Sequence, residues 1–198
     1  MFSKTCIFTL IALSAAAADK PNSLTSKESA QGWKLLFDGT SMNGWESHWA
    51  ESFHVKNGAL VCDGSVMSWL STKDSFGNYD LKLEFRGNAK VNSGVFLRSE
   101  KEGQPHITGY ELQIWDYQPA KYNTGSLVGT AFADPVKILG DQWNRYQITA
   151  EGGHFVIVLN GKKLLDTRDS KHASGVIGFQ CQKDQLIEFR NIKILPRK

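Results

Sequence analysis

Apolar and polar residues alternate along most of the chain, which is the pattern of β-strands with one buried face. In the clearest segment, Tyr79, Leu81, Leu83 and Phe85 alternate with four charged residues. Further strands are expected at residues 53–55, 59–61, 94–99, 110–116, 145–150, 155–159, 162–165, 176–182 and 186–195. No segment has a sustained helical period with caps, and the best short helical candidate surrounds Trp69.

Turn signals separate these segments. The pairs Asn57-Gly58 and Asn160-Gly161 each stand between two apolar runs, and both residue types tolerate the positive φ of a two-residue hairpin turn. The apolar phase of the last strand changes near Arg190-Asn191, which predicts a β-bulge there. Many short strands with frequent turns predict an all-β fold: a two-sheet antiparallel β-sandwich of the jelly-roll type with few or no helices.

The N-terminus departs from this pattern. Lys4 precedes an uncharged apolar run at residues 6–18, and three alanines come before Asp19, as in a signal-peptide cleavage site. The run is shorter than the about 20 residues that a membrane-spanning helix needs. We therefore expect a signal peptide over residues 1–18, a flexible lead-in over residues 19–30 and one β-domain over residues 31–197. The mature protein is expected to be periplasmic or secreted, and not integral to a membrane.

Net charge and cysteine content bear on the class of partner and on the cellular compartment. The chain has 23 basic and 20 acidic residues, a net charge of +3 and no basic block, so nucleic acid is not an expected partner. Cys62 and Cys181 occupy apolar phases of their strands, which slightly favours two core thiols, although export would permit a disulfide. The sequence contains no cysteine–histidine cluster with zinc-like spacing.

The strand at residues 110–116 carries the most informative polar pattern. If its apolar residues face the core, then Glu111, Gln113 and Trp115 share the opposite face. Carboxylates and amides bind sugar hydroxyls, and an indole stacks on the apolar face of a pyranose. The pattern predicts a carbohydrate ligand, and an ordinary half-exposed strand face is the alternative.

Other segments add polar residues to this candidate site. Arg98 would hold Glu111 ionised if the two lay side by side, and Glu84 on the preceding strand would join them. An ordinary cross-strand ion pair is the alternative. Gln180 adds an amide on an outward strand phase, and His106, in the loop before Glu111, is within reach of the same place.

Several motifs, taken in order, resemble the 3-keto-disaccharide hydrolase domain family. They are Phe37-Asp38-Gly39-Thr40, Asn43-Gly44-Trp45, Val55-Lys56-Asn57-Gly58-Ala59-Leu60, Asn92-Ser93-Gly94-Val95-Phe96-Leu97-Arg98, Gly109-Tyr110-Glu111-Leu112-Gln113-Ile114-Trp115-Asp116, Thr124-Gly125, Trp143-Asn144, Leu159-Asn160-Gly161 and Phe189-Arg190-Asn191-Ile192. Each motif is weak alone, and together they cover nearly the whole chain after residue 32. The resemblance implies a jelly roll similar to concanavalin A-type lectins and laminarinase-like glucanases, bacterial export and action on 3-keto-glycosides.

The sequence also departs from these relatives. The glucanases have a third acid where this chain has Gln113, and Asp116 would reach the face of Glu111 only through a bulge. In the family a histidine often stands two residues after the glutamine of the penultimate strand, but here Gln180-Cys181 is followed by Gln182. After Thr124-Gly125 the family usually has Ala-Leu-Tyr, and this chain has Ser126-Leu127-Val128.

The resemblance implies cleavage by proton abstraction, elimination and hydration. A ketone at C3 acidifies the proton on C2, so the reaction needs a base, a group that stabilises the enolate oxygen and an acid for the leaving oxygen. We expect Glu111 as base or acid, Arg98 as enolate stabiliser and Asp116 as a second carboxylate, with a divalent metal ion as an alternative electrophile. The expected substrate-binding residues are Gln113, Trp115, Gln180, Glu84, Tyr110 and His106.

Three other functions fit the same residues. A non-catalytic, lectin-like module would bind sugar without turnover. A direct two-carboxylate glycoside hydrolase would cleave unoxidised glycans. An interaction domain without a sugar ligand is the third, and the polar row beside Trp115 argues against it.

Overall fold

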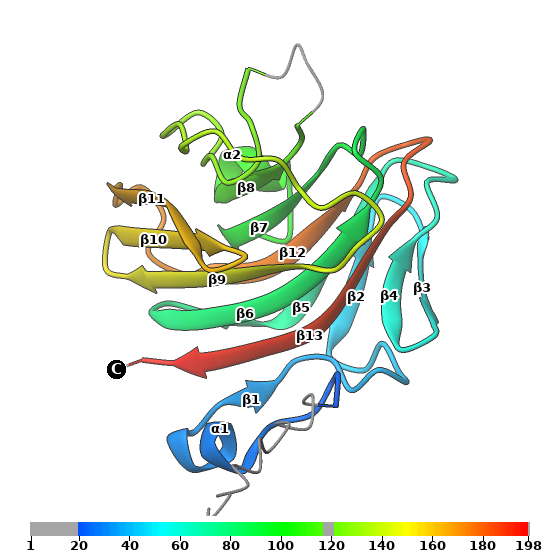
Figure 1. Ribbon diagram of the computed structural model, residues 1–198, viewed down its shortest axis with the longest axis horizontal. Helices are drawn as coiled ribbons and strands as arrows, with labels where there is room; N and C mark the ends of the chain where they lie inside the picture. The colour runs from blue at the N-terminus through cyan, green and yellow to red at the C-terminus, as the bar shows by residue number, and fades with distance from the viewer. Residues whose placement is uncertain (1–19, 117–120, 198) are drawn as a thin grey trace, which may run out of the picture.

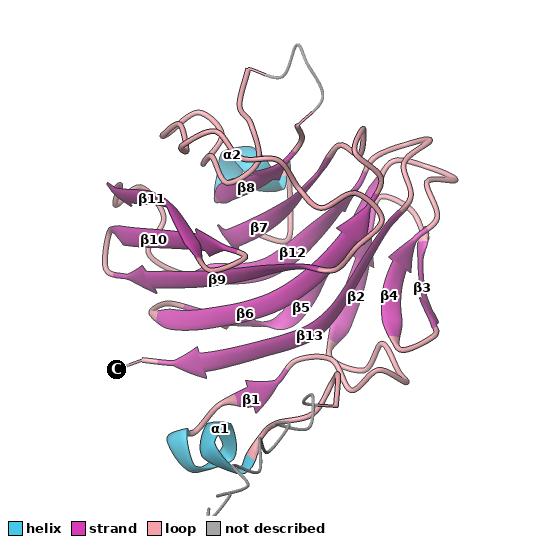
Figure 2. Ribbon diagram, in the orientation of Figure 1, coloured by secondary structure: helices cyan, strands magenta, loops and turns pink. Residues whose placement is uncertain are grey.

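The computed structural model describes residues 20–116 and 121–197, and it is built almost entirely from strands (Figures 1 and 2). The expected signal peptide at residues 1–18 lies outside the described residues. The elements are α1 (Ser26–Gln31), β1 (Lys34–Leu35), β2 (Trp45–His48), β3 (Phe53–Lys56), β4 (Ala59–Cys62), β5 (Ser68–Phe76), β6 (Tyr79–Gly87), β7 (Ser93–Ser99), α2 (Pro105–Thr108), β8 (Tyr110–Ile114), β9 (Asn144–Glu151), β10 (His154–Leu159), β11 (Lys162–Arg168), β12 (Gly175–Cys181) and β13 (Ile187–Pro196). Within the described ranges, no helix has the length and apolar character needed to cross a bilayer.

The strands form two antiparallel sheets, as the alternation predicts. The larger sheet has eight strands in the order β11-β10-β9-β6-β13-β4-β3, with β1 paired to β13. The smaller sheet has five strands in the order β2-β5-β12-β7-β8. Figure 1 shows β6, β9 and β13 of the larger sheet in front of β5 and β12 of the smaller one. The two-sheet, all-β jelly roll expected from the sequence is confirmed.

One core fills the space between the sheets. Phe85 and Tyr146 contribute from the larger sheet, and their rings lie 5.1 Å apart. Phe179 on β12 stacks on Phe189 on β13 with ring centroids 4.1 Å apart, so this pair joins the two sheets directly. Burial of such side chains is the main force that holds the sheets together.

A disulfide also links the sheets. Cys62 on β4 and Cys181 on β12 are bonded, with Cα atoms 5.5 Å apart. The preference for two free core thiols is therefore wrong. Both side chains do face the core, as their strand phases indicate, but β4 and β12 bring them opposite each other across the sandwich.

The expected hairpins and bulge are present. Asn57 and Gly58 have φ of 51° and 75° in the turn between β3 and β4, and the Asn160-Gly161 turn between β10 and β11 has the same left-handed conformation. The register of β13 against β6 shifts between Arg190 and Lys193, where the apolar phase changes.

The segment expected as a lead-in contains a short helix that packs on the larger sheet. Residues 26–31 form α1, which begins with a capping box between Thr25 and Glu28. The Glu28 carboxylate lies 2.8 Å from Lys193 Nζ and 3.1 Å from Lys82 Nζ, so it fixes α1 to β13 and β6. The segment around Trp69, the best short helical candidate in the sequence, is not helical, because residues 68–76 form the strand β5.

Candidate functional site

The candidate site lies on the outer face of the five-stranded sheet. Cross-strand partners share a face of a sheet, and the pairs His48–Trp69, Trp69–Gln180 and Gly94–Gln113 each occupy this one. Gln180 and Gly94 are neighbours as well, because the adjacent residues Phe179 and Val95 are partners. These five residues, His48, Trp69, Gln180, Gly94 and Gln113, cross all five strands, and we call them the polar row.

The side chain of Glu111 leans into the polar row. Glu111 is the cross-strand partner of Phe96, yet its Oε1 lies only 2.6 Å from where a Cβ at position 94 would be. The carboxylate therefore occupies the space that Gly94 leaves empty, between the strands that carry Gln113 and Gln180. Glu111 and Gln113 lie on the same face of the sheet, as the sequence predicts.

Burial sets the protonation of Glu111. The residue is 6% exposed, and no group in the described parts of the chain donates a hydrogen bond to its carboxylate. Burial raises the pKa of Glu111 to about 7, because the charged form loses hydration without gaining a partner. At neutral pH the carboxyl can both accept and donate a proton, as a general acid–base group must.

Two further polar groups on this face are unpaired. The indole Nε1 of Trp69 and the Oε1 of Gln180 are buried and have no hydrogen-bond partner among the described residues. Leaving such a group unpaired costs about 1–3 kcal/mol, so water or a ligand is expected to satisfy it. The polar row thus carries two buried, unpaired polar atoms beside the acid–base carboxyl of Glu111.

Close packing fixes the indole of Trp69. The ring of His48 stacks on it at 4.0 Å, and Phe96 meets it edge-on at 5.7 Å. A Cβ at position 178 would lie 3.0 Å from the ring, so Gly178 gives the indole its room. The indole of Trp69 is therefore fully enclosed, and its N–H is buried with the ring.

His48 was not anticipated from the sequence. Its Nε2 lies 2.8 Å from Ser71 Oγ, and burial lowers the pKa of the imidazole, which favours the neutral form. The strand β2 that carries it is only four residues long, and β5 is buried on both faces at its start, so neither shows clear alternation. A neutral, oriented histidine is available at the end of the row opposite Gln113.

The structure does not place Arg98 beside Glu111. Two residues of β7 oppose one of β12 at this point, and the φ of Arg98 is +55°. This bulge turns the side chain to the inner side of the sheet, where it is 1% exposed and lies 5.2 Å from the Phe155 ring. Its guanidinium donates to the carbonyl oxygens of Gly77, Gly152 and His172. The expected ion pair and enolate-stabilising role are therefore excluded.

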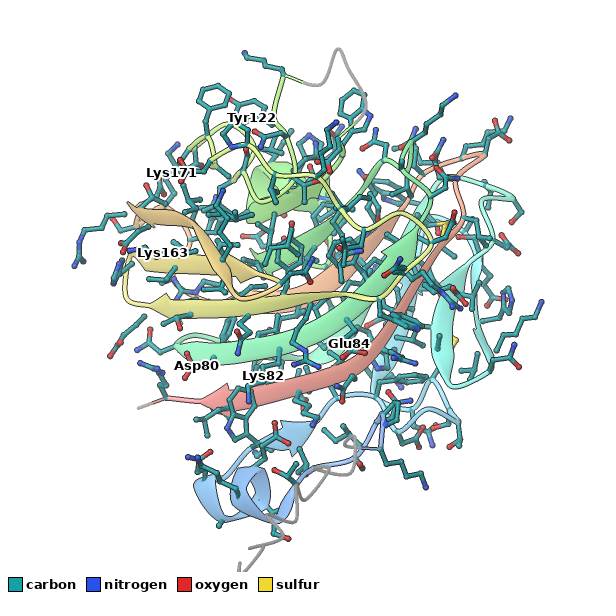
Figure 3. All side chains as sticks on the ribbon, viewed as in Figure 1. Asp80, Lys82, Glu84, Tyr122, Lys163 and Lys171 are labelled. Carbon is teal, nitrogen blue, oxygen red and sulfur yellow. A yellow bond between two sulfur atoms is a disulfide. The ribbon has the colours of Figure 1, made fainter. Side chains whose placement is uncertain are left out.

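Two other carboxylates are also placed elsewhere. Glu84 lies on β6 of the larger sheet, on the face that Figure 3 turns toward the viewer, and it pairs with Arg190 and Arg145. Although burial opposes it, these two ion pairs lower the pKa of Glu84. Asp116 follows the end of β8, and its Oδ2 accepts a hydrogen bond from the backbone N–H of Ile138. No bulge in β8 brings it to the face of Glu111.

The remaining predicted binding residues are dispersed. Tyr110 packs between the sheets against Phe155, and its hydroxyl donates to Asp169, so it does not reach the polar row. His106 is exposed on α2 and borders a separate hollow of about 140 Å³ with Tyr110. Trp115 is half-buried just beyond β8, and its contact with a ligand stays a prediction.

The described residues contain no group of three or more His, Cys, Asp or Glu side chains that could hold a metal ion. The carboxylates proposed for the chemistry are in fact spread over both sheets, as Glu84 and Glu111 illustrate.

Comparison with known proteins bears on this site. The model of the 3-keto-alpha-glucoside-1,2-lyase-like domain matches residues 32–195. The chain belongs to this family. No curated protein matches the sequence.

Solved structures share the fold of this lyase-like domain. Two Parabacteroides distasonis proteins proposed to be glycosyl hydrolases are similar. The first has 23% sequence identity and a TM-score of 0.79, and the match covers 90% of this chain and 100% of that protein. The second has 25% sequence identity and a TM-score of 0.71, and the match covers 83% of this chain and 99% of that protein. The carbohydrate-binding module CBM66 of Bacillus subtilis has 16% identity and a TM-score of 0.56, covering 76% of this chain and 94% of the module. The chain thus shares its fold with proteins described as glycosyl hydrolases and with a carbohydrate-binding module.

Two departures from the family motifs fall next to the polar row. Residues 124–128 of the lyase-like domain run along the free edge of β8, where the Val128 N–H donates to the Glu111 carbonyl and Gln113 exchanges bonds with Gly125 and Ser126. Val128, which replaces the usual tyrosine, is therefore the lateral neighbour of Glu111. Gln182, which replaces the usual histidine, follows β12 directly. The site of this chain therefore has Glu111 flanked by Val128 and Gln182 in place of the tyrosine and histidine that the resemblance implies.

Proposed function

We propose that the chain is an exported hydrolase that cleaves 3-keto-glycosides, with Glu111 as the acid–base residue. The observation that carries the proposal is the buried, unpartnered Glu111 carboxyl, which lies between two amide-bearing strands and has a pKa of about 7. Family membership supplies the substrate class, and the Cys62–Cys181 disulfide is in keeping with an oxidising compartment outside the cytoplasm.

In the proposed reaction, the Glu111 carboxylate removes the proton on C2 of the oxidised sugar. The electron pair of that C–H bond moves into the C2–C3 bond and places negative charge on the C3 oxygen. Collapse of this enolate restores the ketone, forms the C1–C2 double bond and expels the C1 oxygen, which takes a proton from the protonated Glu111. Water then adds its hydroxyl to C1 and a proton to C2.

The polar row supplies hydrogen bonds for this sequence. The side-chain amides of Gln113 and Gln180 are the donors closest by strand position to the Glu111 carboxyl. They take over the role first expected of Arg98, since preorganised donors stabilise a developing oxyanion. Gln113 Oε1 already accepts from the Ile114 N–H, which leaves its NH₂ pointed for donation.

Turnover of a panel of 3-keto-glucosides and their unoxidised forms tests the proposal. We expect cleavage of the keto forms alone, with kcat/KM rising through pH 7 to a plateau at higher pH, and a loss of about 100- to 10,000-fold in Glu111→Gln. Glu46→Gln is the matched control, because Glu46 is an exposed carboxylate on the same sheet, paired with Lys101. Full turnover by Glu111→Gln would refute the assignment.

A lectin-like module is the second candidate, and the replacements at Val128 and Gln182 favour it. In that case the protein binds sugar saturably without cleaving either form. Cleavage of unoxidised glycans would instead indicate a direct glycosidase, which the single carboxylate of the polar row argues against.

A further inference from the structure

Trp49 is an exposed aromatic residue held in a strained conformation beside the polar row. It follows β2 directly, its φ is +68°, and it is 55% exposed. Its ring meets that of Trp69 at 6.5 Å with an interplanar angle of 64°. A bulky side chain at positive φ is a true outlier, and such strain concentrates at sites of function.

Two neighbours extend this exposed apolar surface. Val66 and Met67 come just before β5, at the end of the strand that pairs with β2, and both side chains are exposed. We call Trp49, Val66 and Met67 the Trp49 rim. The ring faces of Trp69 are covered by its neighbours, so Trp49 is the indole of this pair that can stack on a sugar.

The geometry of the sheet relates the rim to Glu111. The Glu111 carboxyl sits over β7, and β12 and β5 separate that strand from β2. Three interstrand spacings place the rim about 14 Å away, which is more than one pyranose ring can span. On the other side of Glu111, residues 124–128 close the edge of β8. A ligand that extends from Glu111 along the polar row toward β2 therefore reaches the Trp49 rim.

We propose that the Trp49 rim is a subsite for a sugar ring on the leaving-group side, so that the substrates are oligosaccharides lying across the strands from Glu111 to Trp49. This inference rests on the proposed function of Glu111. The oxidised sugar is attacked at C2 and cut at C1, and the chain expelled from C1 runs along the polar row past Gln180 and His48. The indole of Trp49 stacks on a ring of that chain.

The test uses glucose oligomers of one to four units, oxidised at C3 of the non-reducing sugar, with the methyl 3-keto-glucoside as the shortest substrate. We expect kcat/KM to increase with length, and Trp49→Ala to lose about tenfold on the longest substrate while leaving the methyl glycoside unchanged. Trp49→Tyr should keep most of the gain. Leu139→Ala, which removes an equally exposed apolar side chain before β9, should have no effect. An unchanged length dependence in Trp49→Ala would overturn the subsite.

Binding of the unoxidised oligomers to Glu111→Gln separates the two proposals. Affinity that rises with length and is lost on adding Trp49→Ala supports the subsite, even if the wild-type protein turns nothing over and the hydrolase proposal fails. Turnover without any length-dependent binding keeps the hydrolase and refutes the subsite.

Discussion

At the scale of single residues, the raised pKa of Glu111 ties folding to pH. An unfolded glutamate titrates near 4.5 and the folded one at about 7, so between these values the unfolded chain releases a proton that the folded chain retains. The free energy of unfolding therefore falls as pH rises through this window, by at most about 3 kcal/mol, and is level above it.

Glu111→Gln removes the carboxyl whose ionisation lowers the free energy of unfolding. We expect the variant and the wild type to be similarly stable at pH 4, and the variant to be more stable by up to about 3 kcal/mol at pH 8. Urea unfolding at a series of pH values measures the difference, with Glu46→Gln as control. A stability difference that stays constant from pH 4 to pH 8 would contradict the raised pKa.

Arg98 is expected to act on stability and not on chemistry. Arg98→Ala leaves the carbonyls of Gly77, Gly152 and His172 without their charged donor, and we expect a loss of about 3 kcal/mol. The KM of the folded fraction for a 3-keto-glycoside should not change. Arg145→Ala, on an exposed arginine, is the control. Unchanged stability with lost turnover would return Arg98 to the active site.

At the scale of strands, regular alternation explains most of what the sequence predicts. β6, β9 and β10 each bury one face and expose or half-expose the other, so their pattern reveals them. β5 is buried on both faces at its start because the rings of His48, Trp49 and Phe96 pack against Trp69 on the outer side, and a short continuous buried run cannot be told from a helix by periodicity. That is why the residues around Trp69 are the best short helical candidate in the sequence.

The two bulges show the limit of phase arguments. In β13 the apolar residues on both sides of Asn191 mark the change of phase, so the bulge is visible in the sequence. In β7 the bulge falls at Leu97 and Arg98, next to the strand end, and no later apolar residue reports it. Extending the phase of Phe96 by two residues therefore puts Arg98 on the wrong side of the sheet.

The attachment of α1 to the larger sheet depends on one carboxylate. Lys193 is almost fully buried and bonds to Glu28, so Glu28→Gln leaves a buried ammonium without its counter-ion. We expect a loss of about 3 kcal/mol, because breaking one side of a buried pair costs more than removing both. The double variant Glu28→Gln, Lys193→Met should recover most of it in chemical unfolding. A double variant no more stable than Glu28→Gln would show that the charge pair is not what holds α1.

At the scale of the whole molecule, the Cys62–Cys181 disulfide closes a loop across both sheets. The cysteines are 119 residues apart in sequence, and a cross-link of this length is worth about 4–5 kcal/mol through the unfolded state. We expect reduction to lower the free energy of unfolding by about this amount. A Cys62→Ala, Cys181→Ala variant is the control, since reductant should leave its stability unchanged. Equal stability of the oxidised and reduced wild type would refute this contribution.

The candidate site is also a property of the whole fold. Glu111, Gln113 and Gln180 could be found in the sequence, because their strands alternate cleanly. His48 and Trp49 lie more than sixty residues earlier than Glu111 and reach the site only through the strand order, which periodicity does not determine. The sequence could not show that Glu84 lies on the opposite sheet either, because that also depends on the strand order.

The contact between Glu111 and position 94 has a consequence for how the two residues evolve. A side chain at position 94 would occupy the place of the carboxylate, since even a Cβ there falls 2.6 Å from Oε1. A lineage that keeps the acid in this place is therefore expected to keep glycine at 94, whereas a lineage that has lost the acid is free to acquire alanine. An alanine at this position in a gene sequence should accordingly mark relatives in which the acid has been lost or moved.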